Sequence, residues 1–385
     1  MSDPLVSRMQ PHAETIFATM SALALEHDAV NLGQGFPDTD GPERVLEAAR
    51  RAITDGHNQY PPSIGIPELR AAVAAHQEEH HGLVLDPADQ VLVTSGATEA
   101  IAASLLGLVE AGDEVVTFEP SYDSYSACIA LAGGVKRTVP LTFPDLSFDR
   151  DRLTAAFSDR TKVVLLNSPH NPSGKVFSTE ELAVVADLAR EHDAWVISDE
   201  VYEHLTFGVP HVPIATLPGM ADRTLTIGSA GKFFSVTGWK VGWASGPAPL
   251  VRAARVAKQF LTFTTASPLQ HAVAAALEMG PAPLTSLRDS LRTRHDLLVD
   301  GLSAAGLAVR PSQGTYFLVA DLTPIGVTDA LTWCMELPAT AGVAAVPVSV
   351  FCDDPAPTAS LVRFAFCKQE EVLREGARRL AAAID

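Results

Sequence analysis

The sequence alternates short, continuously apolar segments with longer helix-like segments, and this alternation restricts the possible folds more than any other feature. The apolar segments lie at residues 91–95, 114–118, 162–167, 194–198, 224–227 and 241–245. Between them, residues 98–110 are rich in Ala and Leu, and Ser178 with Glu181 forms a capping-box pattern at the start of another helix. Strands that are apolar throughout are typical of a mostly parallel sheet buried on both faces. The pattern therefore predicts an α/β domain with its sheet sandwiched between helices.

The character of the sequence changes after Pro283. An amphipathic pattern covers residues 284–305, short strands are expected at 316–319 and 361–366, and a last helix is expected at 369–384. This order predicts a smaller α+β domain over residues 284–385, beside a large domain over residues 43–283. Residues 1–42 show few periodic signals, and we expect them to form an N-terminal arm and part of the small domain.

Charge and hydropathy argue against some classes of partner. The net charge of −18 would repel nucleic-acid phosphates, so no nucleic-acid partner is expected. No apolar run reaches the roughly 18 residues of a membrane span, and the first residues lack the apolar core of a signal peptide. The four cysteines are scattered without a Cys-x-x-Cys pair, which fits reduced thiols. We therefore expect a cytoplasmic protein without a membrane partner.

Residues with useful chemistry follow the predicted strands at the points where the strands end. In open α/β sheets, ligands bind at the carboxyl ends of the strands, so these side chains are expected to share one site. They are Gly96, Ala97, Thr98, Tyr122, Tyr125, Asn171, Asp199, Tyr202, Ser229 and Lys232.

This combination matches the needs of pyridoxal 5'-phosphate, which requires an imine-forming lysine, an acid for its ring nitrogen and donors for its phenolate. Lys232 lies in a small, apolar setting that is unusual for a solvated amine. Burial and the nearby cation Lys240 would lower its pKa from about 10.4 and make it a better nucleophile. Asp199 would face the ring nitrogen, and Tyr202 and Asn171 would donate to the phenolate oxygen. The alternatives are a surface lysine, a strand-end aspartate that caps a turn, and an Asn-Pro turn.

The ring and the phosphate need further residues. Tyr122 is predicted to stack on the ring, although core packing is the common role of an aromatic side chain, and Tyr125 is assigned to the substrate pocket. Residues 96–98 open a helix whose free amides suit an anion, and Ser229 and Lys240 would add a hydroxyl and a positive charge.

Arg363 lies within an otherwise apolar strand, where a charged side chain is costly unless it is paired. A bidentate contact with the α-carboxylate of a substrate would pair it, and an internal salt bridge is the alternative.

Two other patterns are rejected as sites. His76 and His80 stand four residues apart on a predicted helix, but without a third ligand in the sequence nearby we interpret them as a solvated helix face and expect no metal. Gly33 and Gly35 lack the third glycine and the preceding strand of a dinucleotide-binding loop.

The chain resembles the class I/II aminotransferases of pyridoxal-phosphate fold type I over nearly its whole length. The matching segments are NLGQGFPD (31–38), NQY (58–60), GIPELR (65–70), PHNPSG (169–174), DEVY (199–202), SAGK (229–232), TGWKVG (237–242) and VRF (362–364). The resemblance implies a homodimer with shared active sites. It implies that Tyr60 reaches the partner's cofactor phosphate, that Phe263 lines the partner's substrate pocket, and that Gly35 lies beside the substrate carboxylate.

The resemblance also implies transfer of an amino group from an L-amino acid to a 2-oxo acid by a ping-pong mechanism. Two branches share most of the motifs: the actinobacterial N-succinyldiaminopimelate type, with 2-oxoglutarate as acceptor, and the kynurenine/glutamine/methionine group, with aromatic amino acids as further candidates. A carbon–sulfur β-lyase on the same scaffold is another alternative. A non-catalytic pyridoxal-phosphate-sensing domain of a regulator is a rival of another class, but the N-terminal segment has no room for a DNA-binding domain.

Overall fold

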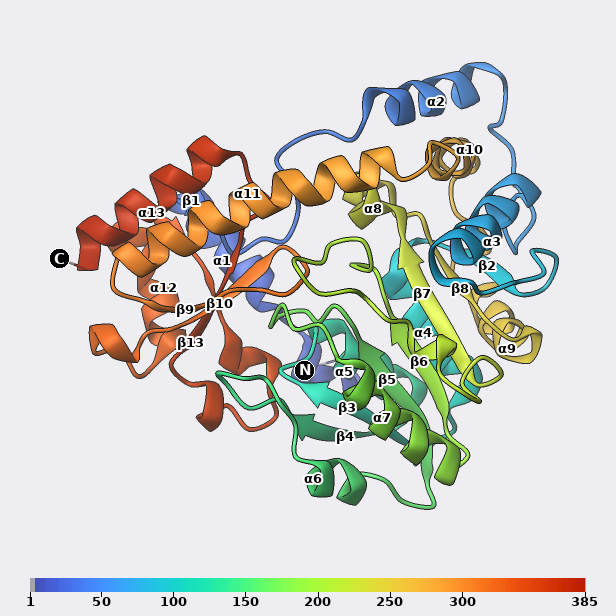
Figure 1. Ribbon diagram of the computed structural model, residues 1–385, viewed down its shortest axis with the longest axis horizontal. Helices are drawn as coiled ribbons and strands as arrows, with labels where there is room; N and C mark the ends of the chain where they lie inside the picture. Colours follow the sequence, from blue (N-terminus) through green and yellow to red (C-terminus); the bar gives the residue numbers. More distant parts are fainter. Residues whose placement is uncertain (1–3, 385) are drawn as a thin grey trace.

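The computed structural model describes residues 4–384, and its central feature is a seven-stranded sheet (Figure 1). The strand order is β2-β8-β7-β6-β5-β3-β4, and β8 runs opposite to all the others. The strands are β2 (Val91–Thr94), β3 (Glu114–Glu119), β4 (Val135–Pro140), β5 (Thr161–Asn167), β6 (Trp195–Asp199), β7 (Thr224–Ser229) and β8 (Gly242–Ser245). The predicted α/β class with a mostly parallel sheet is confirmed, and the carboxyl ends of every strand but β8 meet at one edge.

Helices cover both faces of this sheet because successive apolar side chains of each strand point to opposite faces. On one face, Val115, Val163 and Ile197 pack under α4 (Gly96–Leu108), α5 (Asp123–Ala132) and α9 (Ala248–Lys258). On the other face, strand residues pack against α6 (Arg150–Ala155) and α7 (Thr179–Glu191). The predicted capping box is present at the start of α7, where Ser178 and Glu181 bond reciprocally.

Three further helices enclose the end of the sheet formed by β2 and β8. They are α2 (Glu43–Thr54), α3 (Pro67–His81) and α10 (Ser267–Leu277). In Figure 1, α2 projects from the upper right of the molecule. The short α8 (Ala230–Phe233) follows directly after β7 and carries Lys232.

The second part of the molecule is built on a four-stranded antiparallel sheet of order β12-β13-β10-β9, beside a two-stranded sheet of β1 and β11. Its strands are β1 (Val30–Asn31), β9 (Ala308–Arg310), β10 (Phe317–Asp321), β11 (Val343–Ala344), β12 (Val346–Pro347) and β13 (Leu361–Ala365). Its helices are α1 (Ile16–Glu26), α11 (Ala282–Ala304), α12 (Ala330–Ala341) and α13 (Glu370–Ile384). The domain boundaries at 42 and 283 stay a prediction.

Several elements were not anticipated, and β4 and α1 show two reasons why. β4 is an edge strand whose residues Lys136, Arg137 and Thr138 are only partly buried or exposed, so it lacks the apolar pattern of its neighbours. α1 is rich in Ala and Leu on all sides, which hides the helical period, although Thr15 caps it by accepting a hydrogen bond from the Ala18 amide. β1 then pairs with β11 and ties the N-terminal segment to the second part of the molecule.

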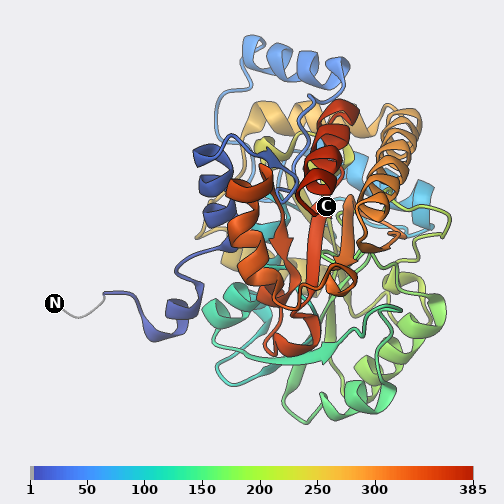
Figure 2. The same cartoon turned by 90° about the vertical axis from the view of Figure 1, so that its left-hand side faces the viewer.

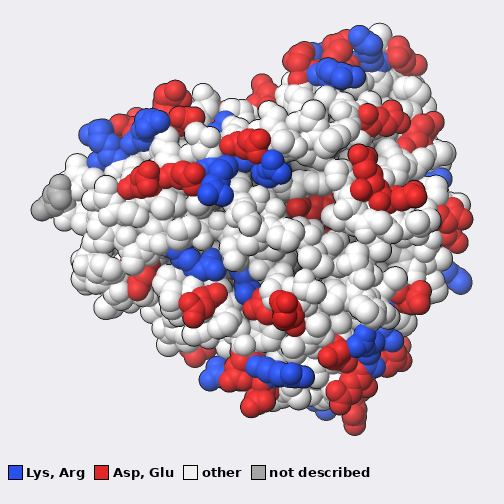
Figure 3. All heavy atoms as spheres, in the orientation of Figure 1, with Lys and Arg blue, Asp and Glu red and all other residues white. Residues whose placement is uncertain are grey.

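Short 3-10 turns complete the chain: η1 (Ser7–His12), η2 (Ile214–Thr216), η3 (Thr237–Trp239), η4 (Thr323–Ile325), η5 (Val348–Phe351) and η6 (Ala356–Thr358). Figure 2 shows that residues 4–12, which precede α1, project away from the body of the molecule. On the face drawn in Figure 3, acidic and basic side chains are interspersed. Within residues 4–384, no helix combines the length and the apolar character needed to cross a membrane.

Candidate functional site

Nearly all the predicted site residues line one cavity of about 300 Å³ at the carboxyl edge of the central sheet. The residues at the carboxyl ends of β3, β5, β6 and β7 come there as expected, whereas Lys240 precedes β8 and Arg363 lies within β13. The cavity is lined by Gly35, Gly96, Ala97, Thr98, Tyr122, Tyr125, Asn171, Asp199, Tyr202, Ser229, Lys232, Lys240 and Arg363. Tyr60 and Phe263 do not line it.

Lys232 is buried and its amine is held by a tyrosine from the second part of the molecule. Its Nζ donates to the Tyr316 hydroxyl at 2.5 Å, and that hydroxyl donates to the Gly35 carbonyl at 2.6 Å. Burial is the main cause that lowers the pKa of Lys232 to about 8, and the cations Lys240 and Arg363 act in the same direction. At pH 7 about one amine in ten is then neutral, far more than for an ordinary lysine. Lys232 is thereby suited to act as a nucleophile and a base.

This lowered pKa gives a direct prediction for the ligand-free protein. Only the neutral amine reacts with acetic anhydride, so the acetylation rate of Lys232 should rise with pH and level off above about pH 8. A model peptide lysine, with a pKa of about 10.4, should continue to accelerate to higher pH. Peptide mass spectrometry at a series of pH values measures both rates. A rate at Lys232 that still rises in parallel with the model peptide between pH 9 and pH 10 would contradict the assignment.

Asp199 is a buried carboxylate at the end of β6 with a tyrosine as its partner. Burial raises its pKa to about 6, while a hydrogen bond from the Tyr125 hydroxyl, at 2.6 Å, opposes the rise. The group is therefore mostly ionised at pH 7. Asn167 helps to fix this segment, because its amide donates to the Asp199 carbonyl at 2.8 Å and its oxygen accepts from the Asn171 amide at 2.7 Å. Tyr125 thus contacts Asp199, which favours a positioning role over the predicted contact with substrate.

The opposite wall of the cavity offers donors and positive charge. Ser95 precedes α4, and Gly96 adopts φ +79°, so a side chain there would be strained. A Cβ at Gly96 would lie 3.3 Å from the Lys240 amine, which shows that this amine lies over the start of α4. A Cβ at Gly242 would lie 2.9 Å from the Ala97 amide nitrogen, so glycine is needed there for the helix start to pack against β8. Among the described residues, Lys240 forms no ion pair.

Arg363 is 1% exposed, yet no carboxylate of the described residues forms an ion pair with it. Its guanidinium donates to Asn171 Oδ1 at 3.1 Å and to the Gly33 carbonyl at 2.7 Å, and its Nε has no partner. The Phe317 ring lies 4.1 Å from the guanidinium carbon. Burial lowers the pKa of Arg363 to about 10, so it remains charged at neutral pH. The internal salt bridge considered from the sequence is therefore not formed.

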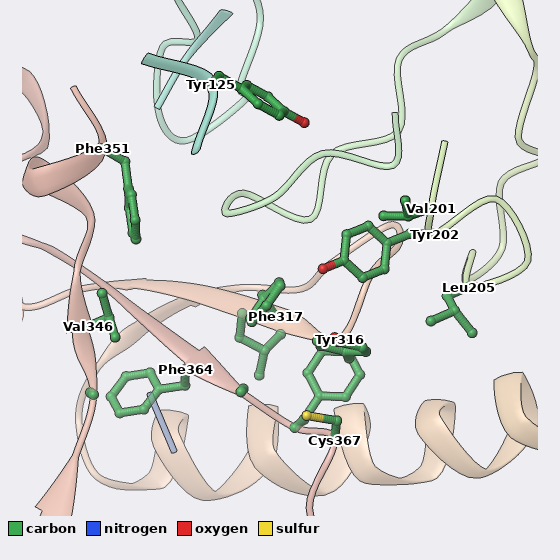
Figure 4. Packing of buried hydrophobic residues seen from close by; sticks show 14 of the residues in the cluster. Tyr125, Val201, Tyr202, Leu205, Tyr316, Phe317, Val346, Phe351, Phe364 and Cys367 are labelled. Carbon is green, nitrogen blue, oxygen red and sulfur yellow. The ribbon is translucent and has the colours of Figure 1, made fainter. Parts of the chain in front are cut away.

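Aromatic side chains line much of the cavity. Tyr122 and Tyr125 meet edge to face, with ring centres 5.7 Å apart, and burial raises the pKa of Tyr122 to about 12. The rings of Tyr202 and Tyr316 lie 5.2 Å apart, and Figure 4 shows them next to one another. The stacking role of Tyr122 stays a prediction.

Sequence reasoning missed Tyr316, Asn167 and Phe17 as site residues. Phe17 comes from α1, which the sequence did not reveal, and Tyr316 precedes β10 in a distant part of the chain. No local motif marks Tyr316, because its importance depends on where β10 is placed relative to Lys232.

Tyr60 and Phe263 lie together on the surface. Tyr60 is 86% exposed, and the two rings meet edge to face at 5.7 Å. They are thus available to another molecule, and their predicted contact with a partner's site stays a prediction.

The interpretation of His76 and His80 as a solvated helix face is wrong. His76 is 4% exposed, because the segment after β6 covers this side of α3. His76 Nε2 lies 2.9 Å from Glu203 Oε1 and 2.9 Å from His204 Nε2, so further potential ligands lie nearby that sequence spacing did not reveal.

The cavity fits pyridoxal 5'-phosphate by the chemistry of its side chains. It combines an amine of lowered pKa, a buried ionised carboxylate, and a helix start with an unpaired lysine over it. A buried arginine with an unpaired Nε remains for a carboxylate ligand.

Comparisons with known proteins agree with this chemistry. A family profile described as aminotransferase class I and II matches residues 27–380. A protein named probable N-succinyldiaminopimelate aminotransferase, from Mycobacterium tuberculosis, is 52% identical over 98% of both chains. The methionine aminotransferase of Escherichia coli is 41% identical over 98% of this chain and 99% of its own. The solved structure of N-succinyldiaminopimelate aminotransferase from Mycobacterium tuberculosis has a TM-score of 0.96, covering 98% of this chain and 100% of that one.

Proposed function

Because this chain belongs to the class I and II aminotransferase family, it is an aminotransferase, and we propose that it moves the amino group of N-succinyldiaminopimelate to 2-oxoglutarate with pyridoxal 5'-phosphate as cofactor. The observation that carries the activity is the convergence of Lys232, Asp199 and Arg363 in one cavity. The observation that supports the substrate pair is 52% identity over almost the entire chain.

In the proposed mechanism, the cofactor supplies an electron-accepting ring adjacent to the Cα of the amino acid. Lys232 Nζ would remove the Cα proton as a base and then deliver it, as an acid, to a carbon of the cofactor rather than back to Cα. Asp199 keeps the ring nitrogen protonated, and Tyr125 holds the Asp199 carboxylate in place. Arg363 binds the substrate carboxylate and so orients the Cα–H bond.

The remaining residues would hold the cofactor. The amides of residues 96–98, the Ser229 hydroxyl and the Lys240 amine would bind the phosphate. Tyr202 and Asn171 would donate to the phenolate oxygen, and Tyr122 would stack on the ring.

The surroundings of the cavity offer support for a long, anionic substrate. A second hollow of about 800 Å³ shares Tyr122 with the first and is lined by His12 and Lys136. Lys136 Nζ contacts Ser126 Oγ at 2.9 Å and pairs with Asp353. N-Succinyldiaminopimelate carries a distal carboxylate that the Lys136 amine could bind, although Glu14, Asp123 and Asp353 line the same hollow.

A second candidate is a methionine, kynurenine, glutamine or aromatic amino acid aminotransferase. The aromatic wall that Phe17, Phe317 and Phe351 form around Arg363 favours an apolar side chain, and the methionine aminotransferase is 41% identical. A carbon–sulfur β-lyase remains the third alternative.

The substrate is tested by initial rates with N-succinyldiaminopimelate, methionine, kynurenine, glutamine and phenylalanine, each against 2-oxoglutarate and pyruvate. We expect kcat/KM for N-succinyldiaminopimelate to exceed the others by at least about tenfold, since one additional charged hydrogen bond contributes about 1.5–3 kcal/mol. A higher kcat/KM for methionine or kynurenine would replace the first proposal with the second. Release of pyruvate and ammonia from cystathionine, faster than any transamination, would favour the lyase.

The assembly and the location are also part of the proposal. Tyr60, Phe260 and Phe263 are exposed apolar side chains, which supports a homodimer whose subunits complete each other's sites. All four cysteines are free thiols, which is consistent with a reducing cytoplasmic environment.

A further inference from the structure

Outside the active-site cavity, five histidines and two glutamates gather between α3 and the segment that follows β6. We call this group the histidine–glutamate cluster, and it consists of His76, His80, His81, Glu200, Glu203, His204 and His211. Neither the proposed mechanism nor the cofactor uses any of these side chains. Four of their contacts are shorter than 3.0 Å, so the cluster is a built arrangement rather than a loose surface group.

Three atoms at the centre of the cluster compete for one proton. His76 Nε2 lies 2.9 Å from Glu203 Oε1 and 2.9 Å from His204 Nε2, while His204 Nε2 lies 3.3 Å from the same carboxylate oxygen. A carboxylate only accepts hydrogen bonds, so each imidazole would have to donate to it. If both nitrogens carry a proton, the two N–H groups face each other. If only one of the two nitrogens carries a proton, only one imidazole can donate to Glu203, and the other nitrogen lies close to the carboxylate without a hydrogen bond.

The charge balance of the cluster is also unfavourable, because its two buried carboxylates have no Lys or Arg partner among the described residues. The side chains of Glu200 and Glu203 are 1% and 2% exposed, and among the described residues their only ion-pair partners are imidazoles. Buried carboxylates that are paired only with imidazoles favour a cation.

We propose that the cluster binds one divalent transition-metal ion, with Zn²⁺ as the expected metal, through His76, His80, His204 and Glu203. The ligand atoms of His76, His80 and His204 lie within 4.8 Å of one another. Tetrahedral ligands at about 2.0–2.1 Å from zinc are about 3.3 Å apart, close to the separations of 2.9–3.3 Å among His76, His204 and Glu203. Imidazole and carboxylate ligands suit zinc. The ion would replace the shared proton, and the partly exposed His80 would complete the set of four ligands.

The metal site would support the segments that carry Tyr202 and Lys232, on the side away from the cavity. Glu203 follows Tyr202 directly, and the His204 ring lies 4.7 Å from the ring of Phe233, the residue after Lys232. His81 Nε2, at 2.9 Å from the other oxygen of Glu203, would orient this ligand. A bound ion would thus link α3 to the segment that carries Tyr202, next to the helix that carries Lys232.

The test uses the full-length protein with any affinity tag removed. After treatment with a chelator, the protein is titrated with Zn²⁺ in competition with a chromophoric chelator, and bound metal is counted by inductively coupled plasma mass spectrometry. We expect one ion per chain and a higher Tm with zinc than with chelator. X-ray absorption should show nitrogen and oxygen ligands at about 2.0–2.1 Å.

Two variants separate this site from adventitious binding. His80→Ala, at the partly exposed edge of the cluster, should weaken Zn²⁺ binding by at least about tenfold, since even groups that only support a ligand contribute about 10- to 100-fold. Glu203→Gln keeps the shape of the side chain but removes its charge, and it should also weaken Zn²⁺ binding. This variant keeps the test informative if His80→Ala folds poorly. His57→Ala is the matched control, because it disrupts the surface histidine pair of His57 and His271, whose rings lie 3.8 Å apart. The proposal would be overturned if the parent protein did not bind one Zn²⁺ per chain. It would also be overturned if His80→Ala and Glu203→Gln bound Zn²⁺ as tightly as the parent protein.

Discussion

Replacing Lys232 with Ala is expected to abolish transamination while leaving the fold intact. The amine is the proposed base, and its hydrogen bond to Tyr316 is one contact among the many that join the two parts of the molecule. Loss of a general acid–base group alone lowers the rate by about 10²–10⁴, and the same side chain is also the proposed nucleophile for the cofactor, so the combined loss should be larger. The measurement is the single-turnover rate of the variant with amino acid alone, together with full turnover in the coupled assay.

Cofactor attachment provides the control for this first prediction. Borohydride reduction of the parent protein, followed by peptide mapping, should place the cofactor on Lys232. The variant should retain some noncovalent cofactor, because the donors around Lys240 and the start of α4 are unchanged. Lys162→Ala, which removes an exposed lysine on β5, should behave like the parent protein. Full activity in Lys232→Ala, or a label on another lysine, would disprove the role.

Replacing Arg363 with Lys is expected to raise KM for both the amino acid and the 2-oxo acid. Lysine keeps the positive charge but loses the planar pair of donors that can bind a carboxylate at two points. One lost hydrogen bond to a charged group costs about 1.5–3 kcal/mol, so kcat/KM should fall by about 10- to 100-fold. Steady-state kinetics with each substrate varied separately measure the effect.

The matched control for Arg363 is a change in substrate. A primary amine that has no carboxylate cannot use Arg363, so its slow half-reaction should be equal in the parent protein and in Arg363→Lys. A uniform loss with both kinds of substrate would instead indicate that Arg363 supports the fold through Asn171 and Gly33. An unchanged KM for amino acids would refute a contact with the substrate carboxylate.

The sequence alone was sufficient to predict six of the seven strands of the large sheet and most of the residues at its carboxyl edge. Nearly continuous apolar runs such as 162–167 and 194–198 became β5 and β6, because strands buried on both faces are apolar at most positions. Asp199 is the last residue of β6 and Lys232 comes shortly after β7, so their shared location follows from the topology of a mostly parallel sheet. β4 escaped prediction because an edge strand is only half covered and tolerates Lys136 and Arg137.

Contacts between distant segments were decided only by the tertiary structure. Tyr316 reaches Lys232 across 84 positions, and Arg363 meets Gly33 across 330, so no local pattern could have indicated either pair. The burial of His76 depends on the segment after β6, which covers a helix face that the sequence suggested was solvated. Sequence thus determined which residue types follow each strand, because that depends on local periodicity. Packing determined which of them lose water and lie close to one another, and therefore set the pKa values of Lys232 and Asp199.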